Sequence, residues 1–234
     1  MSFPKGSAAG PSGLRPQHLL DALSVQQFFD VPTNLQALVN KMLSGTVPDT
    51  VMPYLAGANL LAYRKPGGGV RPIAVGETLR RLVSKCAVAS VKDEARGFFA
   101  PTQVGVAVPG GVEAAVLAVS TALTENPDLV ALKVDFRNAF NEVDRGTFLA
   151  EVEEHFPGLS RWAWWCYGKQ SYLQFAGEVV VSAAGVQQGD PLGPLLFDLA
   201  LHVLVRRLEE LGLEFQVWYH DDGTLVGTRG LRVH

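Results

Sequence analysis

The chain has 234 residues, of which 47% are hydrophobic and 18% charged, and its formal net charge is −3 at pH 7. This composition excludes an intrinsically disordered chain, and the slightly acidic sum excludes a uniformly basic protein that coats nucleic acid. Cys86 and Cys166 are far apart, so we expect neither a disulfide scaffold nor a zinc module, and a reducing compartment is indicated. No uncharged stretch reaches the roughly 18 residues of a membrane span, and the start lacks a signal-peptide core.

The first half of the chain is predicted to be mainly helical, with one hairpin. Apolar spacing and helix start and stop residues predict helices over residues 15–23, 34–43, 77–95 and 112–124. The runs on either side of the glycine loop 66–69 predict two paired strands, 58–64 and 70–75. Arg80, Arg81 and Lys85 lie off the apolar stripe of the helix 77–95, which predicts a basic helix face.

Strands and helices alternate in the second half. A buried strand is predicted over 129–135, and hairpins over 172–182 and 215–227. Helices are predicted over 195–211 and over 145–155, the latter capped by Asp144 and ended by Pro157-Gly158. The mixture of elements predicts an α+β fold.

Charge is unevenly distributed along the sequence. Residues 64–96 contain eight basic and three acidic side chains, a local net charge of +5, so the remainder carries about −8. This imbalance indicates one surface for anions and another for cations, although solvated helix faces alone could produce it.

Three carboxylates stand where predicted strands end. Asp135 closes the strand 129–135, and Asp221 and Asp222 occupy the tip of the last hairpin. Turn chemistry could explain each feature separately. Together they predict a carboxylate cluster, which stays ionised only with cations between its members, and Mg²⁺ prefers such oxygen ligands together with substrate phosphates. Two such ions could activate a hydroxyl and stabilise a leaving pyrophosphate.

These residues resemble the palm motifs of reverse transcriptases, closest to those of non-LTR retrotransposons. Tyr219-His220-Asp221-Asp222 is similar to the Tyr/Phe-X-Asp-Asp signature. The other similar segments, in the family's order, are Gly10–Leu14, Arg71–Ile73, Val134–Asn141 and Gly185–Phe197. The resemblance covers nearly the whole chain and implies an RNA-directed DNA polymerase with fingers (1–125) and an incomplete palm (126–234), the thumb being absent.

The resemblance also implies residue roles. Asp135, Asp221 and Asp222 would hold two Mg²⁺ ions, for which Mn²⁺ could substitute, while a primer 3′-hydroxyl attacks a deoxynucleoside triphosphate. The nucleotide would be contacted by Lys65 (or Arg64 in its place), Arg71, Phe136, Phe140, Gln188 and Gly189. The bulky ring of Phe140 would clash with a ribose 2′-hydroxyl. Arg80, Arg81 and Lys85 would contact nucleic acid.

An RNA template and a DNA primer are the implied partners, with no membrane and no oligomeric state indicated, and the family's lifestyle implies an intracellular, nuclear site. We expect the chain to be a fragment that needs a thumb for full activity. Two alternatives stay open: an inactive remnant that only binds nucleic acid, and an RNA-directed RNA polymerase, against which Phe140 argues. His220 departs from the small or apolar residue usual in the signature. Trp162, Trp164 and Trp165 could form a base-stacking platform or belong to the core.

Overall fold

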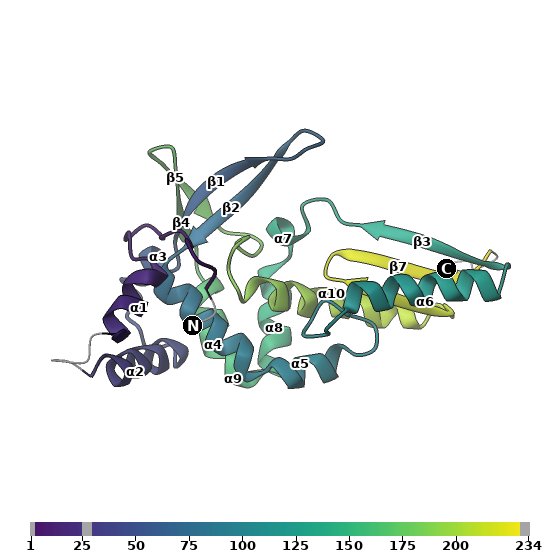
Figure 1. Cartoon of the computed structure of the whole chain (residues 1–234), viewed down its shortest axis with the longest axis horizontal. Coiled ribbons are helices and arrows are strands. Elements are labelled where there is room, and N and C mark those ends of the chain that lie inside the picture. Colours follow the sequence, from purple (N-terminus) through teal and green to yellow (C-terminus); the bar gives the residue numbers. More distant parts are fainter. Residues whose placement is uncertain (1–2, 25–29, 230–234) are drawn as a thin grey trace. The chain divides into compact units, whose positions relative to one another are not determined.

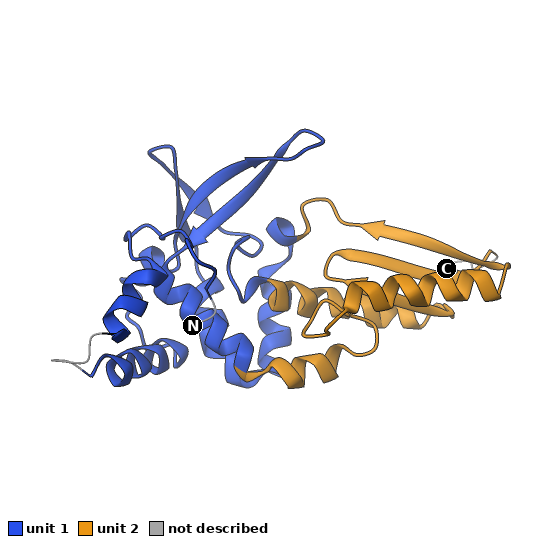
Figure 2. Cartoon of the chain, viewed as in Figure 1, with its two compact units in different colours: residues 1–89, 140–193 blue, residues 90–139, 194–234 orange. Residues whose placement is uncertain are grey.

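The computed structural model describes residues 3–24 and 30–229. The chain divides into two compact units, each built from two segments (Figure 2). Unit 1 comprises Met1–Ala89 and Phe140–Gly193, and unit 2 comprises Ser90–Ala139 and Pro194–His234. The chain therefore passes between the units three times.

Unit 1 contains a four-stranded sheet. Its strands are β1 (Ala58–Arg64), β2 (Val70–Gly76), β4 (Ser171–Phe175) and β5 (Glu178–Ser182), in the order β2-β1-β4-β5 (Figure 1). Both predicted hairpins are present as antiparallel pairs, and β1 and β4 pair in parallel. Gly68 and Gly69 have positive φ in the first hairpin's loop, so the triglycine supplies a backbone conformation that other residues rarely adopt.

The helices that lie wholly or mainly in unit 1 come from both of its segments. They are α1 (Pro16–Ser24), α2 (Val31–Leu43), α3 (Met52–Leu55), α4 (Thr78–Ser90), α7 (Ala139–Glu142), α8 (Arg145–His155) and α9 (Pro157–Tyr167). The predicted cap of α8 is confirmed, since the Asp144 carboxylate accepts a hydrogen bond from the Thr147 amide at 2.6 Å. Helix α9 was not predicted. Pro157 ends the preceding helix and also begins α9, where the first turn tolerates proline.

Two of the three clustered tryptophans belong to the core of unit 1. The rings of Trp162 and Trp165 stack with centroids 5.1 Å apart, and the indole of Trp162 donates to the Ser84 hydroxyl. Both side chains are buried, whereas Trp164 is 47% exposed. The core interpretation is therefore correct for Trp162 and Trp165.

The predicted basic helix 77–95 differs from the structure in two respects. It is interrupted at Val91, so that α4 is followed by a separate helix, α5 (Lys92–Phe99). Arg80 is also not on a solvated face, because only 1% of the residue is exposed. The apolar stripe alone could not reveal this, since the partners of Arg80 come from distant parts of the sequence.

Unit 2 contains a three-stranded antiparallel sheet and the helices beside it. The sheet consists of β3 (Leu129–Asp135), β6 (Phe215–Tyr219) and β7 (Asp222–Thr228), in the order β3-β7-β6. Helix α6 (Gly111–Glu125) contacts β3 and β6, and the long α10 (Gly193–Glu209) follows from unit 1. None of the helices in the described part of the chain is long and apolar enough to span a membrane.

Candidate active site

Strand register brings two of the predicted carboxylates together in unit 2. Asp222 pairs with Asp135 on one side and with Tyr219 on the other, so all three side chains lie on the same face of the sheet. His220 and Asp221 form the two-residue turn that joins β6 to β7. Lys133 Nζ lies 3.9 Å from Asp222 Oδ1, and because both side chains are well exposed this contact contributes little stability.

The acidic neighbours of Asp221 affect its pKa. Its pKa is raised above the ordinary value by partial burial and by the negative charges of Asp222 and Asp135, against a lowering by its own backbone amide. The charges of Asp222 and Asp135 therefore oppose ionisation of Asp221, an effect that a bound cation would offset.

The donor set suits a hard divalent cation, because carboxylate oxygens are the ligands that Mg²⁺ prefers. Among the residues that the structure describes, no three His, Cys, Asp or Glu side chains are gathered in a group that could hold a metal ion. Asp135, Asp221 and Asp222 fit such an ion by donor type and charge, and strand register makes Asp135 and Asp222 neighbours. Their side chains do not converge on a single point.

Packing behind the turn explains the glycine that follows the two aspartates. Trp218 pairs with Gly223, and a Cβ atom at Gly223 would lie 2.4 Å from the Trp218 ring. The ring of Phe136 stacks on the ring of Trp218, with ring centroids 6.1 Å apart. Phe136, predicted to contact the nucleotide, is thereby fixed beside the end of β3.

The turn itself is held by side chains that sequence reasoning missed. His220 has φ of 54°, and its amide donates to Gln103 Oε1 at 2.8 Å. Its ring Nδ1 lies 2.8 Å from Asp198 Oδ2. Gln103 Nε2 in turn donates to Asp198 Oδ1 at 3.1 Å and to the His220 carbonyl at 3.3 Å.

Burial and pairing shift the pKa values of both ionisable members of this group. Burial raises the pKa of Asp198 to about 6, although the hydrogen bond and charge of His220 oppose the rise. Burial lowers the pKa of His220, but the hydrogen bond and charge of Asp198 outweigh it, so the pKa lies above the ordinary value. Each group therefore binds its proton more firmly in the folded chain.

Unit 1 carries the residues predicted to contact the nucleotide other than Phe136. Lys65 and Arg71 are exposed on the β1–β2 hairpin, where Arg71 pairs with Tyr63 in the strand register. The loop that contains Gln188 and Gly189 lies against the same hairpin, since the Ala74 amide donates to the Gln188 carbonyl at 2.7 Å. Gly189 has φ of 122°, and a Cβ atom there would lie 2.5 Å from the Ala74 carbonyl oxygen.

A buried ion pair holds the loop that contains Gln188 and Gly189. Arg80 Nη2 lies 2.7 Å from Asp190 Oδ2, with both side chains at most 2% exposed. Arg80 also donates to the side chain of Gln187 and to the carbonyl of Ala56, and the Tyr167 hydroxyl donates to Asp190 at 2.7 Å. Burial would lower the pKa of Arg80, but Asp190 raises it, so the guanidinium stays charged. In this fold Arg80 is bonded within unit 1 rather than available to a phosphate.

Phe140 is joined by its backbone to the start of the same loop. Its carbonyl accepts from the Val186 amide at 2.7 Å, and the Gly185 amide donates to Val143 at 3.1 Å. Arg145 secures the other side, because its guanidinium donates to the carbonyls of Ser182 and Gly185 at 3.2 and 2.9 Å. The backbone of the predicted sugar-sensing residue and the Gln188 loop are thus tied together.

The two remaining basic residues of α4 point to the N-terminal segment. Arg81 donates to the Ala8 carbonyl, and its guanidinium carbon lies 5.5 Å from the centre of the Phe3 ring. The Lys85 ammonium lies 5.2 Å from the same ring centre. Both side chains are half-buried, so they are partly accessible to a phosphate.

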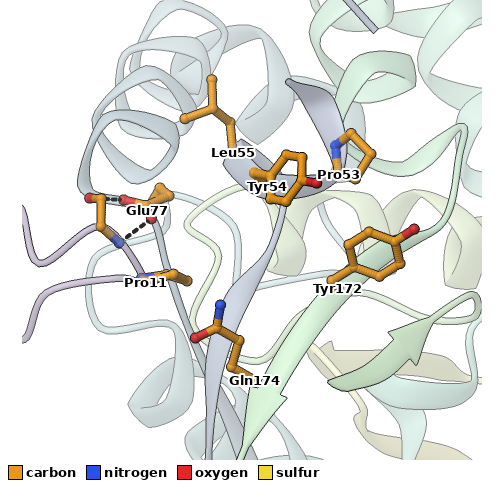
Figure 3. A pocket seen from close by; sticks show the side chains of 8 residues that line it. Pro11, Pro53, Tyr54, Leu55, Glu77, Tyr172 and Gln174 are labelled. Atoms are coloured by element: carbon orange, nitrogen blue, oxygen red, sulfur yellow. Dashed lines mark hydrogen bonds between the residues drawn. The ribbon is translucent and has the colours of Figure 1, made fainter. Parts of the chain in front are cut away.

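Unit 1 also contains a cavity of about 310 Å³ beside Tyr54 and Tyr172, whose ring centroids are 6.4 Å apart (Figure 3). Glu77 lies in its wall and accepts hydrogen bonds from the Ser12 amide and hydroxyl at 2.7 and 2.6 Å. These bonds tie the Gly10–Leu14 segment to the start of α4. The described residues that line the cavity include none of the predicted site residues.

Comparison with known proteins identifies the class. The family model described as reverse transcriptase (RNA-dependent DNA polymerase) matches residues 63–234, so the chain belongs to the reverse transcriptase family. It is 30% identical over 234 residues to the 132 kDa protein of the retrotransposable element SLACS of Trypanosoma brucei gambiense. The match covers 95% of this chain and 19% of that protein, so the chain spans about a fifth of this relative. The predicted resemblance to non-LTR reverse transcriptases is confirmed.

Solved structures agree in fold. The apo telomerase of Candida tropicalis, truncated from its C-terminal domain, has a TM-score of 0.54 at 13% identity, over 83% of this chain and 49% of that one. Telomerase of the same organism in complex with a fragment of telomeric RNA also has a TM-score of 0.54, at 12% identity, over 75% and 36% of the two chains. The α+β class and the fingers-and-palm fold predicted from the sequence are therefore confirmed.

Proposed function

We propose that this chain is the part of an RNA-directed DNA polymerase that performs nucleotidyl transfer from a deoxynucleoside triphosphate to a primer 3′-hydroxyl, copying an RNA template. The observation that carries the proposal is the register of Asp135 against Asp222, with Asp221 in the adjoining turn, in a chain of the reverse transcriptase family. Because the chain spans about a fifth of its relative, further segments would contribute to binding the duplex.

In unit 2, Asp135 and Asp221 are the principal residues that would hold two Mg²⁺ ions, with Asp222 beside them. Bound there, the ions would supply activation of the primer hydroxyl and stabilisation of the departing pyrophosphate. The carboxylates themselves provide the negative charge that holds divalent cations between them and the triphosphate. Phe136, fixed against Trp218, would contact the nucleotide from the same unit.

In unit 1, exposed Arg71 would grip the triphosphate with its planar guanidinium, and Lys65 would add a point charge. Gln188 and Gly189 would approach the base pair that forms, and the ring of Phe140 would exclude a ribose 2′-hydroxyl. Arg81 and Lys85 remain the α4 residues proposed to contact nucleic acid, since Arg80 is committed to Asp190.

The test is metal-dependent primer extension on an RNA template by this chain and by Asp221→Asn, with Mn²⁺ binding measured on both by electron paramagnetic resonance. The substitution keeps the side-chain size but removes a charge, so extension should fall at least about a hundredfold and Mn²⁺ should bind more weakly. Asp128→Asn, at an exposed position before β3, is the matched control and should change neither.

Extension that survives Asp221→Asn would overturn the assigned roles. A wild-type chain that binds neither Mn²⁺ nor a deoxynucleotide would instead favour the inactive remnant. Use of ribonucleotides by wild type, or no gain of ribonucleotide use in Phe140→Ala, would contradict the role of Phe140.

A further inference from the structure

The turn between β6 and β7 adopts a conformation that its sequence does not favour. Positive φ falls on His220, the first of the two central residues, a position that glycine usually occupies in hairpin turns of that kind. A side chain with a Cβ atom is strained in this region, and such strain persists only where the surroundings fix it. Asp221, the proposed metal ligand, is the next residue, so the conformation of His220 directs where Asp221 lies.

Gln103 contacts the turn with its whole amide. Its Oε1 accepts from the amides of His220 and Gly105, at 2.8 and 3.0 Å, and its Nε2 donates to the His220 carbonyl and to Asp198. A side-chain amide offers two acceptor and two donor positions, so all four are used. Both backbone polar groups of His220 are thus held by one side chain that is 3% exposed.

The segment that carries Gln103 is itself attached to β6. The Trp218 amide donates to the Thr102 carbonyl at 2.7 Å, and the Val104 amide donates to the Trp218 carbonyl at 2.8 Å. These two bonds hold Gln103 beside β6. The turn begins at His220, two residues after Trp218, so the distance from Gln103 to the turn is fixed.

Asp198 completes the arrangement from α10. Its side chain has no exposed area, and its two oxygens lie against Gln103 and against the His220 ring. Gly105 leaves room for that ring, because a Cβ atom there would lie 3.0 Å from His220 Nδ1. Backbone and ring of His220 are consequently restrained from two different elements of unit 2.

We propose that Gln103 is a positioning residue for nucleotidyl transfer, which together with Asp198 holds the His220 turn so that Asp221 is presented for metal binding. The inference rests on the proposed function. Gln103 is not itself a metal ligand: its side chain bonds only with His220, Gly105 and Asp198 among the described contacts. It acts through the backbone of the residue before Asp221.

The experiment compares Gln103→Met with Gln216→Met in the full 234-residue chain. Gln216 is a matched control, because it is also buried in unit 2 and makes two side-chain hydrogen bonds, to the Val205 carbonyl and from the Trp218 indole, neither of which is with a residue of the turn. In Gln103→Met, exchange of the His220 amide should accelerate at least about tenfold relative to Gln216→Met, because its acceptor is lost. Mn²⁺ should bind more weakly in Gln103→Met alone.

Kinetics provide a readout that simple destabilisation would not give. Primer extension by Gln103→Met should lose about tenfold or more in kcat with KM for the deoxynucleotide within about twofold, because a displaced carboxylate affects the transfer step. Glycine accepts positive φ without support. The triple variant Gln103→Met, Asp198→Ala, His220→Gly should therefore recover much of the lost kcat and of the Mn²⁺ binding.

The outcomes separate the two proposals. A wild-type chain that binds neither Mn²⁺ nor a deoxynucleotide contradicts the proposed function, and the positioning role falls with it, while amide exchange still reports whether Gln103 holds the turn. If wild type binds Mn²⁺ and Gln103→Met binds it equally well, or if the triple variant is no better than Gln103→Met, the positioning role is wrong and the proposed function stands.

Discussion

The Gln188 loop of unit 1 is supported by a buried ion pair, whereas the carboxylates of unit 2 are brought together by strand register. Beneath the Gln188 loop, Arg80 and Asp190 form an ion pair that is almost fully buried. Asp135 and Asp222 are exposed, and they are neighbours because β3 and β7 pair in that register. Substitutions in the ion pair beneath the Gln188 loop should therefore act first on stability, and substitutions at the unit 2 strand ends on metal binding.

The largest expected effect comes from breaking the buried pair. Arg80→Met should destabilise unit 1 by about 3 kcal/mol, because it leaves the Asp190 carboxylate buried with only its neutral partners. Urea unfolding followed by the fluorescence of the buried Trp162 and Trp165 measures this. Arg161→Met, the same change at an exposed position of α9, should shift stability by less than about 0.5 kcal/mol. Equal effects of the two would show that the buried ion pair does not stabilise unit 1.

A smaller effect on stability is expected from pH, through the buried carboxyl of Asp198 beside His220. Because the pKa of Asp198 is raised to about 6 in the folded chain, stability is present at low pH and lost as the pH rises from about 4 through 6. The raised pKa of His220 acts in the same direction above pH 6.5. Relative to Asp198→Asn, wild type should lose on the order of 2 kcal/mol between pH 4 and pH 7.

The free energy of unfolding of both chains is measured at several pH values by urea unfolding. If it changes with pH equally in wild type and Asp198→Asn, Asp198 is not buried as described. The comparison removes the pH dependence of groups that do not contact Asp198, while the loss of the Asp198 charge on His220 adds to the difference in the same direction.

The smallest expected effect concerns the space beside the His220 ring. Gly105→Ala should destabilise by about 1 kcal/mol, because its Cβ atom would lie 3.0 Å from both His220 and Gln103. Gly97→Ala is the control of opposite sign: nothing lies within 4 Å of its Cβ position in α5, so alanine should stabilise by about 0.5 kcal/mol or more. Thermal unfolding measures the stability of both variants. If Gly105→Ala is stabilising, the His220 ring and Gln103 are not packed as closely against Gly105 as described.

The sequence predicted what depends on neighbours in the chain. The strand before Asp135 and the turn around Asp221 follow from local composition, and the register of β3, β7 and β6 then brings the acidic residues together. The burial of Arg80 could not be predicted, since its carboxylate partner is 110 residues away. The role of Gln103 was missed for the same reason, because its contact with His220 spans 117 residues.

The glycine at position 185 has a consequence for how this chain could be altered. A Cβ atom there would lie 2.1 Å from the Asn141 carbonyl oxygen, and φ is 61°. A library randomised at this position should return glycine almost exclusively among folded chains. Since the contact joins the Phe140 segment to the Gln188 loop, a backbone shift of one segment would move the other, so the proposed roles of Phe140 and Gln188 could not be altered independently through the backbone.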